Sequence, residues 1–230
     1  MKAVLLIAGL GTRLRPLTDS IPKCLLPING VPLLAIWFDK LLAAGVPEVL
    51  INTHWLAGQV SEFVADSTPK GLRVRVSYEP TLLGSAGTLA ANRDFCSDGP
   101  FFIIYGDNLS DVDLADLYAS HMQQRPVLTL GTFEAECPER CGIAEIDLEG
   151  VVRGFVEKPE RPLSNHAAAG IYVAEPEIFD YFPEHSNSSV LDLGFDVIPK
   201  LVGQMRNYSI KQLIDIGTHE NYQKANGVLC

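Results

Sequence analysis

Residues 2–23 read KAVLLIAGLGTRLRPLTDSIPK, an apolar run followed at once by a turn rich in glycine, proline and positive charge. The run over residues 2–8 has the length and composition of a buried strand. The glycines after it allow an anion to come close to the backbone and accept positive φ angles. Arg13 and Lys23 add positive charge. This stretch predicts a phosphate-binding turn at the end of the first strand.

The pattern of this turn differs from two common phosphate-binding motifs. Leu14 stands where the dinucleotide fingerprint has its third glycine, and no Lys-Ser or Lys-Thr pair follows the glycines as in a P-loop. Pro16 and Pro22 disfavour a regular helix, so we expect a long loop. Taken alone, the same residues also suit a loop that binds nothing.

Composition limits the class of protein. The 230 residues, 47% of them hydrophobic, suffice for a sizeable core, and we expect a single domain over residues 1–230. The formal net charge of −10 disfavours nucleic acid as a partner, because such proteins need a basic stripe. Any phosphate site must be a local island of positive charge.

The five cysteines are odd in number and scattered, which predicts a reducing, cytoplasmic environment. Only Cys137 and Cys141 lie close together, and no second Cys or His cluster completes a zinc site. No apolar run approaches the roughly 20 residues that cross a membrane, and the first run lacks a signal-peptide cleavage site. We expect no membrane partner, and the sequence does not decide whether the chain forms a homo-oligomer.

Apolar, β-branched-rich runs recur along the first half and alternate with a stretch of helical apolar spacing at 33–42. The expected strands are 2–8, 48–53, 72–78, 101–105 and 127–133. Strands that alternate with helices form a mostly parallel sheet covered on both faces. The predicted fold class is therefore α/β, a Rossmann-like three-layer sandwich. The glycines at 45, 71 and 99 fall between a helix and the next strand, where left-handed helix caps are usual.

The second half has a different texture. Two runs, 142–147 and 151–156, flank Glu149 and Gly150 and predict a hairpin. The further expected elements are a strand at 167–173, helices at about 176–182 and 190–202, a strand near 206–214 and a final helix from about 218. The sheet is thus expected to be mixed, with a small β-hairpin and lid insertion.

Asp111 and Asp113 are spaced like the Asp-x-Asp metal signature of glycosyltransferases. We favour a simpler interpretation, because acidic residues stabilise the N-terminus of a helix and a helical pattern follows through Leu114 and Leu117.

Six motifs carry a resemblance to a known family. They are residues 9–18 with Pro22 and Lys23, 79–88, 106–108, 155–159, 169–172 and 215–218. In content and order they resemble the sugar-1-phosphate nucleotidylyltransferases, and especially the short bacterial guanylyltransferases for D-glycero-D-manno-heptose 1-phosphate or mannose 1-phosphate. The resemblance implies a GT-A-like nucleotidyltransferase fold. It also implies a division of the single domain into 1–135 for nucleotide, 136–212 for sugar phosphate and 213–230 for a metal-binding strand end and terminal helix.

The implied reaction is attack of a sugar 1-phosphate oxygen on the α-phosphorus of a nucleoside triphosphate, with release of pyrophosphate. Alignment and charge neutralisation dominate such catalysis. By resemblance, Arg13 clamps the departing pyrophosphate, Lys23 stabilises charge at the α-phosphate, and Asp107 is the third catalytic residue. The implied nucleotide-binding residues are Leu6, Ala8, Gly9, Gly11, Thr12, Arg13, Glu79, Gly84, Gly87 and Thr88. For the loop at 83–88, a helix N-cap at Ser85 is the structural alternative.

The resemblance implies Mg²⁺ as the cofactor, with Asp107 and Asp215 as its ligands. Magnesium usually takes one or two carboxylates together with phosphate oxygens, so two distant aspartates suffice if the fold brings them together. The implied sugar-phosphate residues are Asn108, Gly142, Glu157, Lys158, Ala169 and Gly170. Many members have Asn before Ala-Gly, whereas this chain has Ala168, and Asn165 or His166 is a candidate substitute.

Several activities compete. We expect guanylyl transfer from GTP to heptose or mannose 1-phosphate, serving synthesis of surface polysaccharides such as capsule or lipopolysaccharide. Uridylyl or thymidylyl transfer to N-acetylmuramate or glucose 1-phosphate is the alternative. A glycosyltransferase that uses a nucleotide sugar would not need Arg13 and Lys23, and a non-catalytic sensor of sugar nucleotides would not need to keep Asp107 and Asp215.

Overall fold

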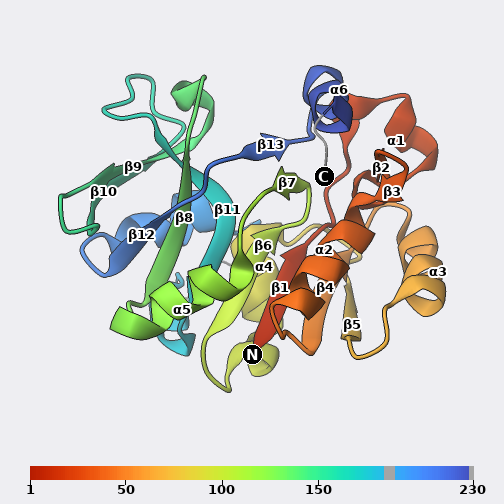
Figure 1. The fold of residues 1–230 in the computed structure, drawn as a ribbon, viewed down its shortest axis with the longest axis horizontal. Coiled ribbons are helices and arrows are strands. Elements are labelled where there is room, and N and C mark those ends of the chain that lie inside the picture. Colours follow the sequence, from red (N-terminus) through yellow and green to blue (C-terminus); the bar gives the residue numbers. More distant parts are fainter. Residues whose placement is uncertain (184–189, 228–230) are drawn as a thin grey trace. The chain divides into compact units, whose positions relative to one another are not determined.

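The computed structural model describes residues 1–183 and 190–227 (Figure 1). The chain forms two compact units, each built from separate stretches of sequence. Unit 1 contains Met1–Leu82, Ile104–Ser110 and Leu213–Cys230, and unit 2 contains Leu83–Ile103 and Asp111–Gln212. Both combine strands and helices, so the α/β class and the mixed sheet are confirmed. The prediction of one domain with a nucleotide part, a sugar part and a metal-binding end stays a prediction.

Unit 1 is built on parallel strands. The strands are β1 (Lys2–Leu6), β4 (Glu48–Thr53), β5 (Arg73–Tyr78) and the end of β6 (Phe101–Tyr105), with β1 paired to β4 and β4 to β5. The middle residues of β1 and β4 are fully buried, as expected for near-continuous apolar runs in a parallel sheet. The predicted first-half strands of this unit are confirmed to within two residues at each end.

Helix α2 (Leu33–Ala43) crosses β1 and β4 in Figure 1, while α3 (Ala57–Ser67) joins β4 to β5. The buried face of α2 consists of Leu33, Leu34, Trp37, Phe38 and Leu41, and this spacing makes one apolar stripe along a helix. The glycines at 45, 71 and 99 all have the expected positive φ. Gly45 directly follows Ala44, the C-cap of α2, whereas Gly71 lies beyond Thr68, the C-cap of α3.

The turn after β1 is more ordered than the long loop expected from its prolines. It holds the 3-10 turns η1 (Thr12–Leu14) and η2 (Lys23–Leu25), with the four-residue helix α1 (Leu17–Ser20) between them. Pro16 directly precedes α1, where a missing N–H costs nothing because the first amides of a helix have no partner within it. The prolines therefore start short helical turns here rather than excluding them.

Two small antiparallel pairs complete unit 1. Strands β2 (Pro27–Ile28) and β3 (Val31–Pro32) form one, and β7 (Asn108–Ser110) and β13 (Leu213–Asp215) form the other. Helix α6 (His219–Gly227) follows β13, as expected for the final helix.

Unit 2 is mostly antiparallel. Strand β11 (His166–Ala174) pairs with β8 (Leu128–Glu134) and with β9 (Gly142–Ile146), and β9 pairs with β10 (Val152–Glu157). The predicted hairpin is thus confirmed. The helices of this unit are α4 (Gly84–Ala91), α5 (Leu114–Gln124) and the short turns η3 (Arg93–Cys96), η4 (Pro138–Arg140) and η5 (Pro176–Tyr181). Asp113 is the N-cap of α5 and accepts from the amides of Ala115 and Asp116, so the helix-start interpretation of this acid is confirmed.

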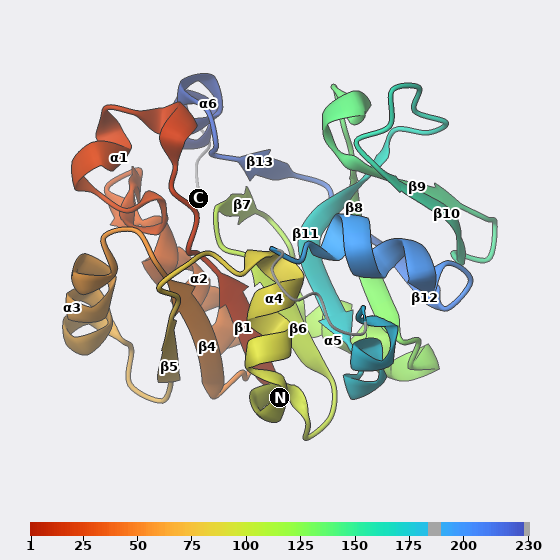
Figure 2. The same cartoon turned by 180° about the vertical axis from the view of Figure 1, so that it is seen from behind.

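Two expected helices of unit 2 differ in type. Residues 176–181 form a 3-10 turn, and the segment expected at 190–202 contains a π-helical turn η6 (Leu193–Val197) followed by a 3-10 turn η7 (Ile198–Leu201). Pro199 lacks the N–H that a continuous α-helix would use, which explains the change of pitch. In Figures 1 and 2, α5 and the η6–η7 segment lie on opposite faces of β8 and β11.

The late strand expected near 206–214 is two strands. Strand β12 (Met205–Ser209) pairs in parallel with β8 of unit 2, whereas β13 pairs with β7 of unit 1. The two halves therefore have different pairing partners, which the pattern of residues along one segment does not reveal.

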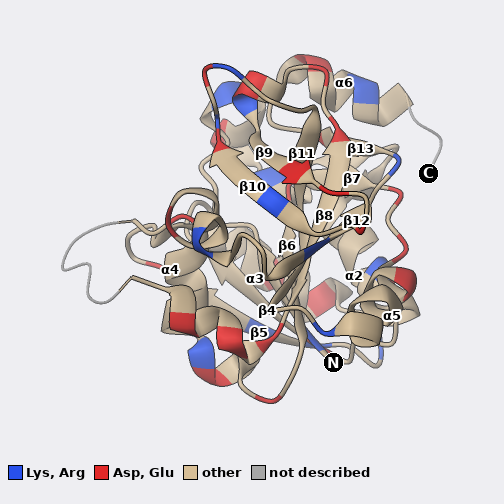
Figure 3. Cartoon of the chain, turned by 90° about the vertical axis from the view of Figure 1, so that its left-hand side faces the viewer, with Lys and Arg blue, Asp and Glu red and all other residues tan. Residues whose placement is uncertain are grey.

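Charged residues are interspersed along the ribbon on the face drawn in Figure 3. No helix within the described residues is long and apolar enough to cross a membrane.

Candidate active site

The candidate catalytic group of unit 1 consists of Lys23, Asp107, Asp215 and Arg13, and Lys23 lies at its centre. Its Nζ lies 2.7 Å from Oδ2 of Asp107 and 3.1 Å from Oδ1 of Asp215, and the Lys23 side chain is 8% exposed. The adjacent thiol of Cys24 is also buried, and burial raises its pKa to about 12, with Asp107 adding to the effect. The thiol is therefore neutral, and the ammonium supplies the local positive charge.

The backbone around the two aspartates explains how they meet. Asp107 follows β6, and its carbonyl accepts from the amide of Ile216 at 3.1 Å. Asp215 ends β13, where the β7–β13 ladder pairs it with Asn108. Asn221 donates from Nδ2 to the carbonyl of Asp215 at 2.8 Å. The small second sheet of unit 1 therefore brings together two acids that are far apart in sequence.

Arg13 reaches the same group from the glycine turn. Its Nη2 lies 3.9 Å from Oδ2 of Asp215, and its side chain is 68% exposed. Gly217 leaves the space for this approach, because a Cβ there would fall 2.7 Å from Arg13 Nη2 and 2.9 Å from Asp215 Oδ1. Gly217 also donates its amide to Oδ1 of Asp215 at 2.8 Å. The glycine of the Asp-Ile-Gly-Thr motif thus lets Arg13 approach Asp215 closely.

The two aspartates fit a magnesium ion by donor chemistry. Their carboxylates converge on one point, and the side chains of Asp107 and Asp215 are 39% and 46% exposed, so a phosphate can reach them. Magnesium prefers carboxylate oxygens completed by phosphate and water. No group of three or more His, Cys, Asp or Glu side chains with metal-binding geometry occurs among the described residues. A metal held here would depend on oxygens from its substrate.

The glycine turn exposes backbone next to Arg13. Gly9 and Thr12 are exposed, and Gly11 takes a φ of +63°. Thr18 fixes the turn by donating from Oγ1 to the carbonyl of Gly11 at 2.7 Å. A side chain at Gly11 would collide with Thr18 Cγ2 at 2.8 Å, so glycine is required both by φ and by space. Of the strand residues predicted to bind nucleotide, Ala8 is buried and Leu6 is half-buried.

Glu79 lies in a buried hydrogen-bonded chain. It is 2% exposed, and Asn52 donates from Nδ2 to its Oε1 at 2.9 Å. Asn52 in turn accepts from the amide of Ile7 at 2.8 Å through its Oδ1. Sequence reasoning missed Asn52, although an amide-bearing residue late in a buried apolar run is a signal of such a link. These two hydrogen bonds connect Glu79 to the ends of β4 and β1.

In unit 2, the segment at 83–88 was predicted to be a loop that binds base and ribose, but Leu83 is the N-cap of helix α4 and residues 84–88 belong to that helix. This segment packs against residue 191. The carbonyl of Leu191 accepts from the amides of Ala86 at 3.0 Å and Gly87 at 3.3 Å. Gly84 has a φ of +79°, and a Cβ there would fall 2.3 Å from the Leu191 carbonyl oxygen. Gly84 and Gly87 therefore have a packing role against Leu191 within the unit. Thr88 is buried and donates from Oγ1 to the carbonyl of Gly84 at 3.0 Å.

Ser85 is not the helix N-cap. Helix α4 begins at Gly84 with Leu83 as its N-cap residue, so the alternative prediction for Ser85 is wrong. The hydroxyl of Ser85 instead donates to Oδ2 of Asp192 at 3.0 Å and accepts from the amide of Leu193 at 2.8 Å. The Ser85 hydroxyl therefore binds the segment at 192–193 instead of an amide of its own helix.

Of the predicted sugar-phosphate residues, Glu157 ends strand β10 and Lys158 directly follows it. Lys158 Nζ lies 3.8 Å from Glu157 Oε1. The side chain of Lys158 is 58% exposed, and that of Glu157 is 16% exposed. Burial raises the pKa of Glu157; Lys158 opposes the shift and Asp192 adds to it. Gly142 lies against Glu157, because a Cβ there would fall 2.4 Å from Oε2. These three predicted residues are brought together.

The predicted Ala169 and Gly170 are less accessible. Ala169 is 1% exposed, and the amide of Gly170 donates to the Tyr172 hydroxyl at 3.2 Å. The β11–β8 register shifts between Ala168 and Tyr172, which fits the φ of +66° at Gly170. Asn165 offers its carbonyl to the amide of Ala135 at 3.0 Å. The predicted Asn108 is also buried, and its carbonyl accepts from Trp37 Nε1 at 2.9 Å.

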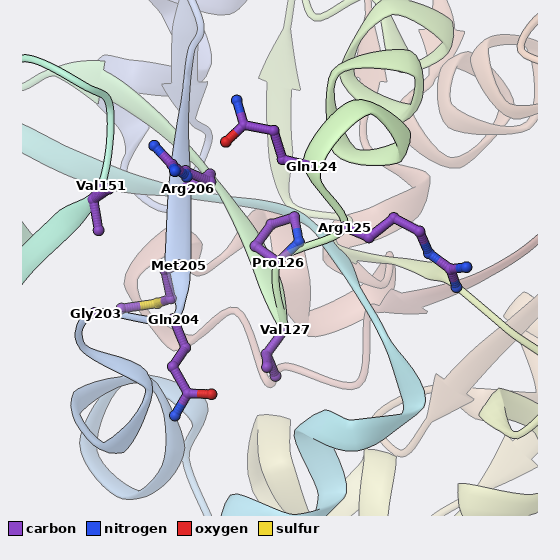
Figure 4. A pocket seen from close by; sticks show the side chains of 9 residues that line it. All are labelled: Gln124, Arg125, Pro126, Val127, Val151, Gly203, Gln204, Met205 and Arg206. Atoms are coloured by element: carbon purple, nitrogen blue, oxygen red, sulfur yellow. The ribbon is translucent and has the colours of Figure 1, made fainter.

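Figure 4 shows a pocket within unit 2. It has a volume of about 320 Å³ and is lined by residues 124–127, Val151 and 203–206. None of the predicted site residues lines it.

The chain is similar to known proteins over its whole length. The chain is 33% identical over 249 residues to the UTP–glucose-1-phosphate uridylyltransferase of Synechocystis sp. (strain ATCC 27184 / PCC 6803 / Kazusa), covering all of this chain and 63% of that protein. It is 30% identical over 234 residues to the mannose-1-phosphate guanylyltransferase catalytic subunit beta of Dictyostelium discoideum, covering 99% and 64%. The chain thus spans less than two thirds of these relatives.

Solved structures match as well. HddC from Yersinia pseudotuberculosis complexed with GMP-PN has a TM-score of 0.81 at 26% identity, with 98% of each chain covered. A candidate glucose-1-phosphate thymidylyltransferase from Bacillus anthracis in complex with a sucrose has a TM-score of 0.87 at 26% identity, covering 99% of this chain and 94% of that one. The family model described as nucleotidyl transferase matches residues 2–229, and this chain belongs to that family.

Proposed function

We propose that this protein transfers a nucleoside monophosphate from a nucleoside triphosphate to a sugar 1-phosphate and releases pyrophosphate. The observation that carries the proposal is the convergence of the Lys23 ammonium with the carboxylates of Asp107 and Asp215, beside Arg13 and an exposed glycine turn. A transfer between two anions needs this combination of positive charge and metal ligands. The relatives named above act on sugar 1-phosphates, which supports the choice of acceptor.

The proposed mechanism follows from the charges. A sugar-phosphate oxygen forms a bond to the α-phosphorus, and the bond between that phosphorus and the bridging oxygen of pyrophosphate breaks. Lys23 neutralises charge at the α-phosphate, and Arg13 holds the departing pyrophosphate. The amides of Gly9 to Thr12 orient the triphosphate. Asp107 and Asp215 would hold Mg²⁺, which supplies Lewis-acid neutralisation of phosphate charge when bound.

In unit 2, we propose that the segment with Gly84, Gly87 and Thr88 lies against the nucleotide. Glu157 accepts from sugar hydroxyls, Lys158 binds the 1-phosphate, and Gly142 contacts the sugar. The carboxylate oxygens of Glu157 are hydrogen-bond acceptors, which suits contact with sugar hydroxyls, and Lys158 Nζ lies 3.8 Å from one of them.

For the base, we propose guanine. Mannose-1-phosphate guanylyltransferases recur among the relatives, and HddC was solved with GMP-PN. Heptose or mannose 1-phosphate would then be the acceptor, and the product would enter surface polysaccharide synthesis. The uridylyltransferase relative from Synechocystis supports the alternative of uridylyl transfer to glucose 1-phosphate.

A matrix of substrates tests the proposal. GTP, UTP, dTTP, CTP and ATP are combined with heptose, mannose, glucose and N-acetylhexosamine 1-phosphates in the presence of Mg²⁺, and pyrophosphate release is measured. Release with GTP and a manno-configured sugar 1-phosphate is expected. Activity only with UTP or dTTP would overturn the choice of guanine.

Reversal separates this activity from that of a glycosyltransferase. Labelled pyrophosphate and a nucleotide sugar should regenerate a labelled triphosphate, which a glycosyltransferase cannot form. Absence of both forward and reverse turnover with every pair would favour a sensor of sugar nucleotides instead.

A further inference from the structure

The turn at 192–197 has a shape fixed by its own side chains. Asp192 accepts through Oδ1 from the amides of Gly194 at 2.8 Å and Phe195 at 3.2 Å. Asp196 in turn accepts through Oδ2 from the amide of Asp192 at 2.7 Å. Two carboxylates therefore brace the start of this π-helical turn, which fixes the position of the Phe195 backbone.

Helix α4 fixes the place of the same turn. The Ser85 hydroxyl donates to Asp192 Oδ2 at 3.0 Å and accepts from the amide of Leu193 at 2.8 Å. Leu191 adds backbone hydrogen bonds to Leu83 and Ala86 at 2.9 and 3.0 Å. The turn is thus attached to the unit on both sides of Asp192.

The turn closes on the proposed sugar-binding carboxylate. A Cβ at Gly194 would fall 2.4 Å from Oε2 of Glu157, the same distance as a Cβ at Gly142. Two glycines from different segments therefore flank one carboxylate oxygen. Any side chain at Gly194 would displace that oxygen.

The proposed phosphate-binding cation of Lys158 lies over one face of the Phe195 ring. The ring centroid lies 5.6 Å from Nζ of Lys158, and Phe195 is 58% exposed. A single exposed apolar side chain is common in proteins. Phe195 differs because a braced turn presents it next to the ammonium, and Lys158 itself takes a φ of +49°, a conformation that is uncommon for a side-chain-bearing residue.

We propose that the ring of Phe195 is the platform for the apolar face of the sugar in the sugar 1-phosphate, and that Asp192 and Gly194 position it together with Glu157. The proposal rests on the proposed function and adds a specificity-determining residue to it. A pyranose offers C–H groups on its face, hydroxyls at its edge and a phosphate at one end. The ring of Phe195 matches the C–H face, the carboxylate of Glu157 matches the hydroxyls, and the ammonium of Lys158 matches the phosphate. Ligand sites commonly combine apolar contact with a few placed polar groups in this way.

Steady-state kinetics on the full chain test the platform. Phe195→Ala should raise KM for the sugar 1-phosphate about 3- to 10-fold, the size of an aromatic contact, and leave KM for the triphosphate unchanged. Phe195→Tyr keeps a ring and should stay within about twofold of the wild type. The matched control is Leu148→Ala, because Leu148 is a fully exposed side chain in the β9–β10 turn and should change neither constant. An unchanged sugar KM in Phe195→Ala, or an equal rise in both KM values, would overturn the proposal.

Gly194→Ala tests the positioning role separately. The added methyl displaces the Glu157 carboxylate, so KM for the sugar 1-phosphate should rise while the thermal midpoint and KM for the triphosphate stay near wild type. A fall in kcat and in both affinities together would show a merely structural effect and contradict the positioning role.

Direct binding separates this inference from the proposed reaction. Binding of mannose 1-phosphate, glucose 1-phosphate and inorganic phosphate to wild type and Phe195→Ala is measured by calorimetry without nucleotide. Weaker binding of the sugar phosphates, with inorganic phosphate unaffected, supports the platform even if no pyrophosphate is released, in which case only the proposed reaction fails. Equal weakening of inorganic phosphate, or no binding of a sugar phosphate to the wild type, overturns the platform.

Discussion

Lys23 carries a buried ammonium between two carboxylates that lie 84 and 192 positions away along the chain. The aspartates retain substantial exposure, whereas the lysine does not. Removing a cation from such a group leaves carboxylates close together without compensation, which is costly for a buried or half-buried pair. The same ammonium is therefore expected to serve both the fold of unit 1 and its chemistry.

Replacement of Lys23 tests this dual role. Lys23→Met should lower kcat about 100- to 1,000-fold, the range for loss of one charge-stabilising group. The thermal midpoint should also fall, because Asp107 and Asp215 then repel each other. Added Mg²⁺ should recover part of the midpoint but not kcat. Full activity in Lys23→Met would contradict the catalytic role.

Asp107→Asn removes charge at an exposed strand end while keeping the shape of the side chain. We expect strongly reduced turnover with a thermal midpoint close to that of the wild type. The matched control is Asp113→Asn at the N-cap of α5, which should keep its activity. Near wild-type turnover of Asp107→Asn at saturating Mg²⁺ would count against the metal role.

At the scale of elements, the parallel strands of unit 1 and the hairpin of unit 2 could be predicted from sequence because their periodicity is local. The family resemblance predicted that Asp107 and Asp215 lie close together. In the structure, the pairing of β7 with β13 brings them close, because Asp215 pairs with Asn108, the neighbour of Asp107. The turn at 192–197 could not be predicted, since its pitch depends on bonds to Ser85 and on Pro199. The buried link of Asn52 to Glu79 is likewise a contact between separate strand ends.

The contact between α4 and Leu191 gives a test with an internal control. Gly84 and Gly150 both have a φ of +79°, but only at Gly84 would a Cβ meet a backbone oxygen, 2.3 Å away. Gly150→Ala should cost about 1 kcal/mol of unfolding free energy from backbone strain alone. Gly84→Ala should cost clearly more, about 2–4 kcal/mol, because the clash is added. Urea denaturation measures the unfolding free energy of both variants. Equal losses of unfolding free energy in the two variants would contradict the packing role.

At the scale of the whole molecule, one buried cluster predicts how stability responds to acid. His121 is fully buried, with Nδ1 2.8 Å from Thr129 Oγ1 and Nε2 3.4 Å from Glu175 Oε1. Burial lowers the pKa of His121 below its ordinary 6.5, although Glu175 opposes the shift. Arg125 forms a two-pronged ion pair with Glu175 at 2.7 and 3.0 Å.

The sign of the pH effect follows from this shift. As pH falls through 6.5, the unfolded chain takes up a proton on His121 that the folded protein does not, so acid favours unfolding. The thermal midpoint should therefore decrease between pH 7 and pH 5, and less steeply in His121→Gln. His219→Gln, at an exposed histidine, is the control and should follow the wild type. Identical slopes in all three proteins would contradict the prediction.

The interleaving of the two units has a consequence for biosynthesis. Lys23 and Asp107 leave the ribosome early, but Asp215 and its strand β13 follow only after all of unit 2 has been made. Domains that are continuous in sequence can fold while translation proceeds. Here the nascent chain carries an incomplete first unit until its last stretch emerges, so Lys23 meets both Asp107 and Asp215 only near the end of synthesis.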